Sequence, residues 1–311
     1  MHCGRETSHS WHKTKSSKFE KGSECRIPFL LTEKLFSCSK CNFIKGKDFD
    51  WSKATDFQMT MDDGVRALPI PGLPEIVSGD NIGHLIADQC LMNDTSPHDG
   101  DLIVVAQKIV SKSENAVLEL STQTPTDEAY RLAQTVGKDP RLVQVVLDQS
   151  TRVVRAVQGV LIVETHHGFV CANAGVDHSN IEGNETVTVL PVDSDRSAEI
   201  IKGAFLHKTG RKVGVVISDT FNRPWREGSI NVAIGIAGFD PLQDLRGTED
   251  DFNREMATSV VSLADEVASM AQLVMGEAGR VPAAIVRGVK WNPGDYSKTR
   301  LLRAANQDLF R

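Results

Sequence analysis

The sequence predicts a mixed α/β fold in which partly antiparallel sheets are flanked by helices. Short β-branched apolar runs, which indicate strands, alternate with longer amphipathic stretches, which indicate helices. These elements do not follow a strict strand–helix repeat, so a wholly parallel sheet is not expected. Two apolar runs, 160–163 and 169–172, flank the turn sequence 165–168 and predict an antiparallel hairpin.

Local signals place strands and helices along the first half of the body. Pro and Gly residues punctuate 69–74, where a rigid turn should end the first strand. Asp139 is suited to cap a helix with Pro140 at its first position, because the missing Pro N–H has no helical partner there anyway. The expected elements are a strand from Ala67, a helix after Ser78–Asp80, a strand over 102–106, a helical segment over 107–112, and helices over 126–136 and 140–148.

Caps and glycines mark the elements of the second half. Asp193 or Ser194 should cap a helix that ends at Gly210. The glycines within 232–238 predict a strand that packs closely against its neighbours. Apolar residues at three- and four-residue steps predict one long helix over 250–275. The remaining strands are expected over 186–190, 213–217 and 283–286.

The predicted hairpin turn contains two adjacent histidines, His166 and His167. Neighbouring side chains in a turn point in different directions, which is unfavourable for binding one metal ion. We therefore expect both histidines to be exposed and neither to be a metal ligand.

Charge is distributed unevenly along the chain. Residues 1–60 contain 11 Lys and Arg against 7 Asp and Glu, whereas residues 61–311 contain 24 against 34. An acidic body argues against a general nucleic-acid-binding protein, and no uncharged apolar stretch approaches the length of a membrane span. Cys90 and Cys171 stand alone in apolar surroundings, as is typical of reduced core thiols. We expect a cytoplasmic protein that binds neither nucleic acid nor membrane.

Residues 1–58 do not have the pattern of a folded domain. They are rich in Ser, Lys and His and lack a sustained helix or strand period. The pair Cys38 and Cys41 has CxxC spacing, but one such pair is a weak zinc signal. The alternative is a disordered or wrongly assigned leader, with Met59 or Met61 as a plausible start. The expected organisation is an unstructured or mis-assigned leader at 1–58, a domain at 59–291 and a C-terminal tail at 292–311.

The stretch Val213–Gly228 combines a buried strand with a cluster of polar residues. Its apolar run ends in Ser218-Asp219-Thr220, and a desolvated carboxylate is costly unless it is paired or bound to a metal. Asp219 and Thr220 oxygens suit a hard cation such as Mg2+ or Mn2+, while Arg223 and Arg226 suit phosphate or carboxylate. The alternative interpretation is that Asp219 caps the next element and pairs with an arginine.

Other segments also bring polar groups to the ends of expected elements. Asp177 and Asn180 follow the hairpin at turn spacing and form either an Asx turn or, with Asp219, a metal site. Glu277 lies at the end of the long helical pattern, where its carboxylate opposes the helix dipole. Lys108 and Lys112 share a face if their segment is helical. They could then hold phosphates, or they could be two solvated lysines.

Familiar nucleotide-binding and hydrolase motifs are absent from the sequence. It contains no GxxxxGK[ST] loop and no GxGxxG after a strand. It also contains no GxSxG elbow and no HExxH helix. A bound nucleotide would therefore need a different frame.

Long motifs follow one another between about residues 66 and 291. They are LPIPGLPEI, GDLIVVAQKIVSK, GFVCANAGVDHSN, VVISDTFNRPWREG with VAIGIAG, and MGEAGRVPAAIVRG. In this order they resemble the coenzyme F420-0:L-glutamate ligase (F420 gamma-glutamyl ligase) family, as a stand-alone ligase domain. The resemblance implies the family's own mixed α/β fold, a homodimer, and GTP-dependent joining of L-glutamate to F420-0 in coenzyme F420 biosynthesis.

The resemblance also implies the groups that the site would bind. It implies GTP, two divalent cations (Mg2+ or Mn2+) and K+. The implied metal ligands are Asp177, Asp219, Thr220 and Glu277. The residues implied for GTP are Gly72, Leu73, Pro74, Glu75, Lys108, Lys112, Asn180, Met275, Gly276, Ala278 and Gly279. Our candidates for clamping phosphate or the incoming glutamate are Arg223 and Arg226.

The implied reaction needs an activated acid, because a carboxylate and an amine at neutral pH form a salt and not an amide. The γ-phosphoryl of GTP would first pass to the lactyl carboxylate of the precursor, and the amine of glutamate would attack the resulting acyl phosphate. Two alternatives remain open. A two-metal GTP phosphohydrolase would hydrolyse GTP without deazaflavin or glutamate, and a non-catalytic nucleotide- or metal-binding protein would bind without turnover.

Overall fold

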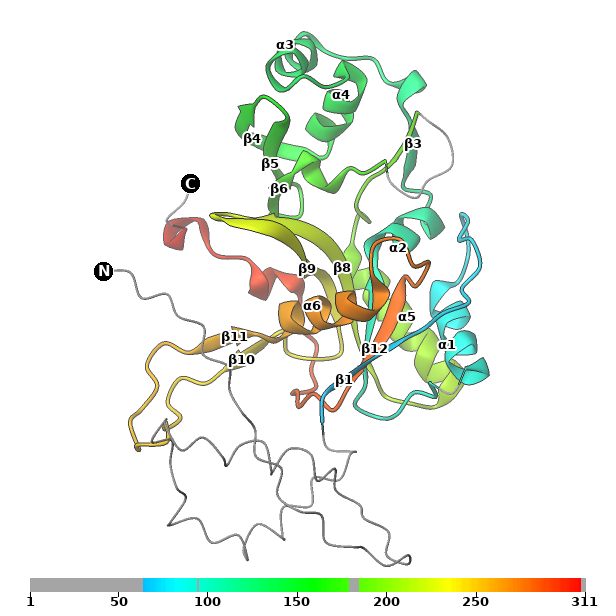
Figure 1. Cartoon of the computed structure of the whole chain (residues 1–311), viewed down its shortest axis with the longest axis vertical. Helices are drawn as coiled ribbons and strands as arrows, with labels where there is room; N and C mark the ends of the chain where they lie inside the picture. The colour runs from blue at the N-terminus through cyan, green and yellow to red at the C-terminus, as the bar shows by residue number, and fades with distance from the viewer. Residues whose placement is uncertain (1–63, 94, 179–184, 309–311) are drawn as a thin grey trace, which may run out of the picture. The chain divides into compact units, whose positions relative to one another are not determined.

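The structure is a computed structural model that describes residues 64–93, 95–178 and 185–308. The leader predicted at 1–58 lies outside the described residues. Within the described ranges the chain forms a central sheet with helices on both faces and a smaller lobe of helices and strands (Figure 1). No helix in these ranges is both long and apolar enough to cross a membrane.

The central sheet is mixed, as the sequence predicts. Its strands stand in the order β1-β12-β2-β8-β9, and only β2 and β8 run parallel. The antiparallel neighbours pair β1 with β12, β12 with β2, and β8 with β9. The strands are β1 (Arg66–Pro69), β2 (Leu102–Ala106), β8 (Gly214–Arg223), β9 (Arg226–Ala237) and β12 (Ala283–Arg287).

Helices cover both faces of this sheet (Figure 1). On one face Ile103 and Val105 of β2 pack with α1 (Ile82–Met92) and α5 (Ser194–Thr209). On the other face Leu102 and Val104 pack against α6 (Leu263–Met275). Successive strand residues point to opposite faces, so one continuous apolar run supplies both cores. This explains why β2 has no polar alternation.

The smaller lobe has its own apolar core. It contains the sheet β4-β5-β6 and two helices, which bury Leu132, Val146 and Val163 between them. The predicted hairpin of β5 and β6 is confirmed, whereas β4 was not predicted because its arginines mask the strand pattern. The elements are α3 (Asp127–Val136), α4 (Pro140–Asp148), β4 (Ser150–Val157), β5 (Val160–Thr165) and β6 (Val170–Ala172).

Short elements complete the described chain. Helix α2 begins directly after β2, which confirms the predicted helical segment. Lys108 and Lys112 are four residues apart in this helix and therefore share a face. The predicted caps are also confirmed, since Asp139 accepts from the N–H of Arg141 (2.8 Å) and Asp193 from that of Arg196 (3.1 Å). The remaining elements are α2 (Gln107–Ser113), β3 (Val117–Glu119), β7 (Thr186–Thr188), β10 (Leu242–Asp244) and β11 (Val260–Ser262), with 3-10 turns at 120–122, 173–175, 298–301 and 305–307.

Strand β8 is longer than the sequence predicts. The apolar run does not end the strand at Ser218, because pairing with β9 continues through Asp219 opposite Val232 and Thr220 opposite Asn231. The turn of this long hairpin is at Pro224 and Trp225. Asp219 therefore lies within a strand, and the prediction that it follows a strand end was wrong. Pairing with β9 satisfies the backbone, which lets polar residues continue the strand.

The long helix predicted over 250–275 is wrong in its first half. Helix α6 begins only at Leu263, after β11. The carboxylate of Asp250 accepts from the N–H groups of Phe252 (2.8 Å) and Arg254 (2.9 Å), which closes a local turn. Such side-chain-to-backbone bonds compete with helix formation. Apolar spacing alone could not reveal this competition.

Part of the segment expected as a C-terminal tail, around residues 297–302, packs on the body. Asp195 of α5 accepts hydrogen bonds from Ser297 Oγ (2.7 Å) and from the Lys298 N–H (3.1 Å). The Lys298 side chain is buried, and Leu302 packs against the core beneath α1 and α5. Helix α5 thus holds this segment along the sheet.

Gly235 of β9 makes the close packing that the glycines of this strand predict. An added Cβ would lie 2.5 Å from the Ser194 carbonyl oxygen at the start of α5. We expect Gly235→Ala to lower the free energy of unfolding by about 1–3 kcal/mol, because backbone must move to admit the methyl group. Urea unfolding would measure this change. Gly203→Ala is the matched control, since its methyl meets nothing within 4 Å and should stabilise the exposed helix position. Equal stabilities for the two variants would contradict the expectation.

His167 in the β5–β6 turn holds a neutral imidazole. Its Nε2 lies 2.9 Å from the Pro191 carbonyl oxygen and therefore donates, while its Nδ1 is buried without a hydrogen-bond partner. Burial lowers the pKa of His167 below its usual 6.5, and the positive charges of Lys298 and His166 act in the same direction. The expectation that this histidine is exposed was wrong, because its ring is half-buried.

The neutral state of His167 should make stability depend on pH. Below pH 6.5 the unfolded chain takes up a proton that the folded ring resists, so stability is lost as the pH falls through that value. The contribution is at most one proton, about 1.4 kcal/mol per pH unit. We expect His167→Gln, whose amide can still donate to Pro191, to flatten the fall in unfolding free energy between about pH 7 and pH 5. Parallel pH curves for wild type and variant in urea unfolding would contradict this.

Candidate functional site

A cleft of about 820 Å³ opens at the end of β2, where the central sheet meets the segment that follows β6. Volumes of this order hold nucleotides and other small ligands. The walls come from segments far apart in the chain. They are residues 73–76 before α1, Ala106 at the end of β2, 107–109 and Lys112 in α2, 172–173 and 175–177 at and after the end of β6, 218–220 in β8, Asn231 in β9, and Gln272 with 275–282 at and after the end of α6.

Two lysines from α2 enter this cleft from one side. Lys108 Nζ lies 2.7 Å from Asp177 Oδ2, and its side chain is largely buried. Lys112 forms an ion pair with Glu75, one turn further along the same helix face. Both lysines therefore line the cleft, and each is paired with a carboxylate. A phosphate-bearing ligand could exchange for these carboxylates, because Lys offers a mobile point charge.

Asp219 reaches the cleft from the face of β8 that meets α2 and Asp177. Burial raises the pKa of Asp219 from its usual 3.8 to about 7, and the negative charge of Asp177 adds to the rise. The N–H of Thr220, the charge of Lys108 and a hydrogen bond from Gln107 oppose it. A cation bound beside Asp219 would favour its ionised carboxylate and so lower this raised pKa.

Thr220 leaves β8 on the opposite face, because consecutive strand residues alternate. Its Oγ1 lies 2.8 Å from Asn231 Oδ1, on the side covered by α6. Asn231 continues through Nδ2 to Gln272 Oε1 (2.9 Å). Gln272 Nε2 donates in turn to Glu277 Oε1 (2.5 Å). Thr220 and Glu277 are thus linked through two side-chain amides.

The loop after α6 forms another wall of the cleft. Met275 ends the helix in the core, and Gly276 turns the chain with a φ of 63° that favours glycine. Glu277 follows as an exposed carboxylate, and Ala278 and Gly279 continue along the cleft. The loop places all of these predicted residues at one opening.

Most of the predicted site residues that the structure describes line this cleft, and three do not. Gly72 lies just outside it, in a turn with a φ of 85°. Arg223 and Arg226 lie at the tip of the β8–β9 hairpin, where the Arg223 guanidinium donates to the Glu227 carbonyl oxygen (3.0 Å). Their clamping role stays a prediction. Asn180 lies outside the described residues.

Sequence patterns did not reveal several polar residues of the cleft. Gln107, Ser218, Asn231 and Gln272 all line it, and Gln107, Ser218 and Asn231 are buried. A polar side chain on a core face is the available signal: Asn231 interrupts an otherwise apolar strand pattern. Gln272 carried no such signal, because a glutamine on a helix surface is ordinary.

The donors fit a hard divalent cation that also contacts its ligand. Among the described residues, no three His, Cys, Asp or Glu side chains are grouped closely enough to hold a metal. Asp177 nevertheless lies near enough to Asp219 to raise its pKa, and all the candidate donors are oxygens. Mg2+ typically takes one or two protein carboxylates and completes its shell with waters and phosphate oxygens. The residues of this cleft fit that pattern.

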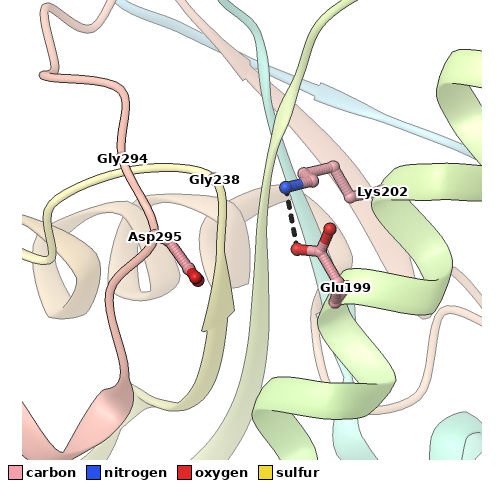
Figure 2. Close-up of a pocket in the computed structure, with 5 residues that line it drawn as sticks. All are labelled: Glu199, Lys202, Gly238, Gly294 and Asp295. Carbon is pink, nitrogen blue, oxygen red and sulfur yellow. Dashed lines mark ion pairs between the residues drawn. The ribbon is translucent and has the colours of Figure 1, made fainter.

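A second hollow, of about 530 Å³, lies beside α5 (Figure 2). Lys202 is paired there with Glu199 at 2.7 Å, and Asp295 lies across from them. The N–H of Gly294 donates to the carbonyl oxygen of Gly238 (3.1 Å), which joins two walls of the hollow. None of the predicted site residues lines it.

The fold and the larger cleft define a class of protein: a mixed α/β chain whose carboxylates, lysines and hydroxyl suit a phosphate-bearing ligand and a hard cation. Comparison with known families makes this specific. The family model described as F420-0:Gamma-glutamyl ligase matches residues 72–288. The chain belongs to this family.

Similar proteins carry a matching name. The chain is 42% identical over 251 residues to the coenzyme F420:L-glutamate ligase of Methanothermobacter thermautotrophicus, covering 80% of this chain and 99% of that protein. It is 43% identical to the enzyme of that name from Methanocaldococcus jannaschii, over 74% of this chain and 90% of the relative. The enzyme of that name from Methanopyrus kandleri is 39% identical, over 79% and 98%.

Proposed function

We propose that this protein joins L-glutamate to coenzyme F420-0 in a GTP-dependent reaction, as a step of coenzyme F420 biosynthesis. The observation that carries the proposal is the cleft. The family resemblance assigns one set of residues to GTP and metal ions, and most of the described members of this set line the cleft. They come from the turn before α1, from α2, from the segment after β6, from β8 and from the loop after α6. The names of the relatives support the glutamate ligase activity.

In this proposal Lys108 and Lys112 bind the phosphates of GTP. Each exchanges its present carboxylate partner, Asp177 or Glu75, for phosphate oxygens. The positive charge of Lys108 also opposes the rise in the pKa of Asp219 that burial causes. Residues 73–75 and 275–279 line the cleft, and in this proposal they would contact the nucleotide.

Asp177, Asp219, Thr220 and Glu277 would hold two divalent cations, Mg2+ or Mn2+. When bound, these ions would neutralise negative charge on the transferring phosphoryl group. Asp219 and Thr220 leave β8 on opposite faces, which supports two separate positions, one beside Asp177 and one beside Glu277. Asp219 must lose its proton to serve as a ligand.

The reaction proceeds in two steps. A carboxylate oxygen of the F420-0 lactyl group attacks the γ-phosphorus of GTP, the bond to the β–γ bridging oxygen breaks, and GDP leaves. The amine of glutamate then attacks the acyl carbon, inorganic phosphate leaves, and the amine loses a proton. Arg223 and Arg226 are candidates for binding the carboxylates of glutamate.

The resemblance also supports a homodimer and stimulation by K+. We propose both for this protein. Light scattering of the purified chain would measure the first, and replacing K+ by Na+ in the ligase assay would measure the second.

The test follows GDP release and product mass together, with GTP, Mn2+, K+, L-glutamate and purified F420-0. We expect a product that is heavier than F420-0 by one or more glutamate residues. One GDP should be released for each glutamate that is added. GDP release that ignores glutamate and F420-0 would overturn the ligase and favour a phosphohydrolase. GTP binding without turnover would favour a non-catalytic binding protein.

A further inference from the structure

We propose that Asn231 and Gln272 are positioning residues that prepare Thr220 and Glu277 to bind a cation. They form a directional chain of hydrogen bonds between the two ligands. The inference deepens the proposed function and rests on it, because it takes the cation-binding role of Thr220 and Glu277 as given. The amides themselves need not touch the cation, the nucleotide or the reacting atoms.

The geometry joins two cleft walls that come from distant parts of the chain. Thr220 Oγ1 to Asn231 Oδ1 is 2.8 Å, and Asn231 Nδ2 to Gln272 Oε1 is 2.9 Å. Gln272 Nε2 to Glu277 Oε1 is 2.5 Å. One end of the chain lies on strand β8 and the other on the loop after α6. Three bonds therefore set the separation of the two proposed ligands.

The direction of the bonds follows from the acceptor at one end. An ionised carboxylate can only accept, so Gln272 must turn its NH2 group toward Glu277 and its oxygen toward Asn231. Asn231 must then turn its own NH2 group toward Gln272 and its oxygen toward Thr220. If both amides were flipped, an amide oxygen would face the Glu277 carboxylate. The charge of Glu277 thus determines the orientation of both amides.

This direction leaves both ends as acceptors toward the cleft. The single hydroxyl proton of Thr220 is donated to Asn231, so only lone pairs of Oγ1 remain for a ligand. At the other end, Glu277 Oε1 accepts from Gln272 Nε2, and the carboxylate offers only oxygen lone pairs to a ligand. At Thr220 and at Glu277, the two ends of this series of hydrogen bonds, the bonding protons therefore point away from a bound cation. A hydroxyl free to rotate would lack this bias.

The surroundings hold Asn231 in place. Asn231 is buried, with only 4% of its surface exposed. Its main-chain carbonyl oxygen accepts a hydrogen bond from Ser269 Oγ of α6 (2.8 Å). Its Nδ2 also lies 3.4 Å from Ser218 Oγ. Gln272 is only partly buried, so it can be changed without opening the core. It is the better position for a test.

The test uses Gln272→Met, which keeps the length of the side chain and removes both hydrogen bonds. Binding of Mn2+ is measured on the full chain by the electron paramagnetic resonance signal of the free ion, with a non-hydrolysable GTP analogue present. We expect the dissociation constant for Mn2+ to rise about tenfold or more, as is usual when partners of metal ligands are removed. Ligase activity should fall more at limiting than at saturating Mn2+. Gln243→Met, at an exposed position of β10, is the matched control and should change neither.

Asn231→Asp provides a second variant. An aspartate there still accepts from Thr220 but, when ionised, cannot donate to Gln272, so we again expect weaker Mn2+ binding. If both variants bind Mn2+ as wild type does, within about twofold, the positioning role is overturned and the proposed function stands; lower melting temperatures of the metal-free variants would then mark a structural role only. If wild type itself binds no Mn2+ with the analogue, the proposed cation sites fall, and this inference with them.

Discussion

Replacing Asp219 by Asn should lower the rate of glutamate ligation about 1,000-fold while leaving the protein folded, on the scale of losing one essential electrostatic group. Asn keeps the size of the side chain and its hydrogen bond with the N–H of Thr220. It removes the charge that the proposed cation needs. The measurement is GDP release coupled to product mass at saturating Mn2+.

The same change should stabilise the metal-free protein. Burial holds the pKa of Asp219 near 7 instead of 3.8, so the folded state retains a proton that the unfolded chain releases between these values. Stability from this group therefore falls as pH rises from about 4 to 7. We expect Asp219→Asn to raise the melting temperature of the metal-free protein more at pH 8 than at pH 4.

Opposite effects on activity and stability would distinguish this residue from a structural one. Asp251→Asn, at an exposed position, is the matched control and should change neither property. Full activity of Asp219→Asn would contradict the proposed cation role. A lower melting temperature at pH 8 would contradict the argument from burial.

Replacing Lys108 by Met should weaken GTP binding about 30- to 100-fold, corresponding to about 2–3 kcal/mol for a lost charged contact. The variant removes the proposed phosphate ligand and leaves Asp177 without its 2.7 Å cationic partner. The Asp219 carboxylate also loses a positive neighbour that favours its ionised form. Titration calorimetry with GTP and Mg2+ would measure the affinity.

Lys202→Met supplies the comparison for Lys108. Lys202 is also paired with a carboxylate, Glu199, but lies in the hollow beside α5 (Figure 2). Pairs at the surface contribute little stability, and no residue that lines this hollow also lines the proposed nucleotide site. We expect unchanged GTP affinity for Lys202→Met. Equal losses in the two variants would mean that general charge, and not a phosphate contact at Lys108, determines binding.

Local chemistry allowed much of the fold to be predicted from the sequence. The caps Asp139 and Asp193 and the apolar run of β2 act over a few residues, so their patterns are visible in the chain. The pattern failed where a distant partner decides the outcome. Pairing with β9 carries β8 through Asp219, and the turn at Asp250 prevents a helix that apolar spacing favours.

The sequence by itself determined the family of this protein, the mixed sheet, and about half of the residues that line the cleft. Sequence motifs reveal these features because each depends on residues that are close together in the chain. Only the tertiary structure decided on which face of β8 the side chain of each polar residue lies. It turned Asp219 toward Asp177 and Lys108, and linked Thr220 through Asn231 and Gln272 to Glu277. The reason is physical: a strand's alternation has meaning only once packing assigns its faces, and hydrogen bonds across a cleft join residues that no spacing relates.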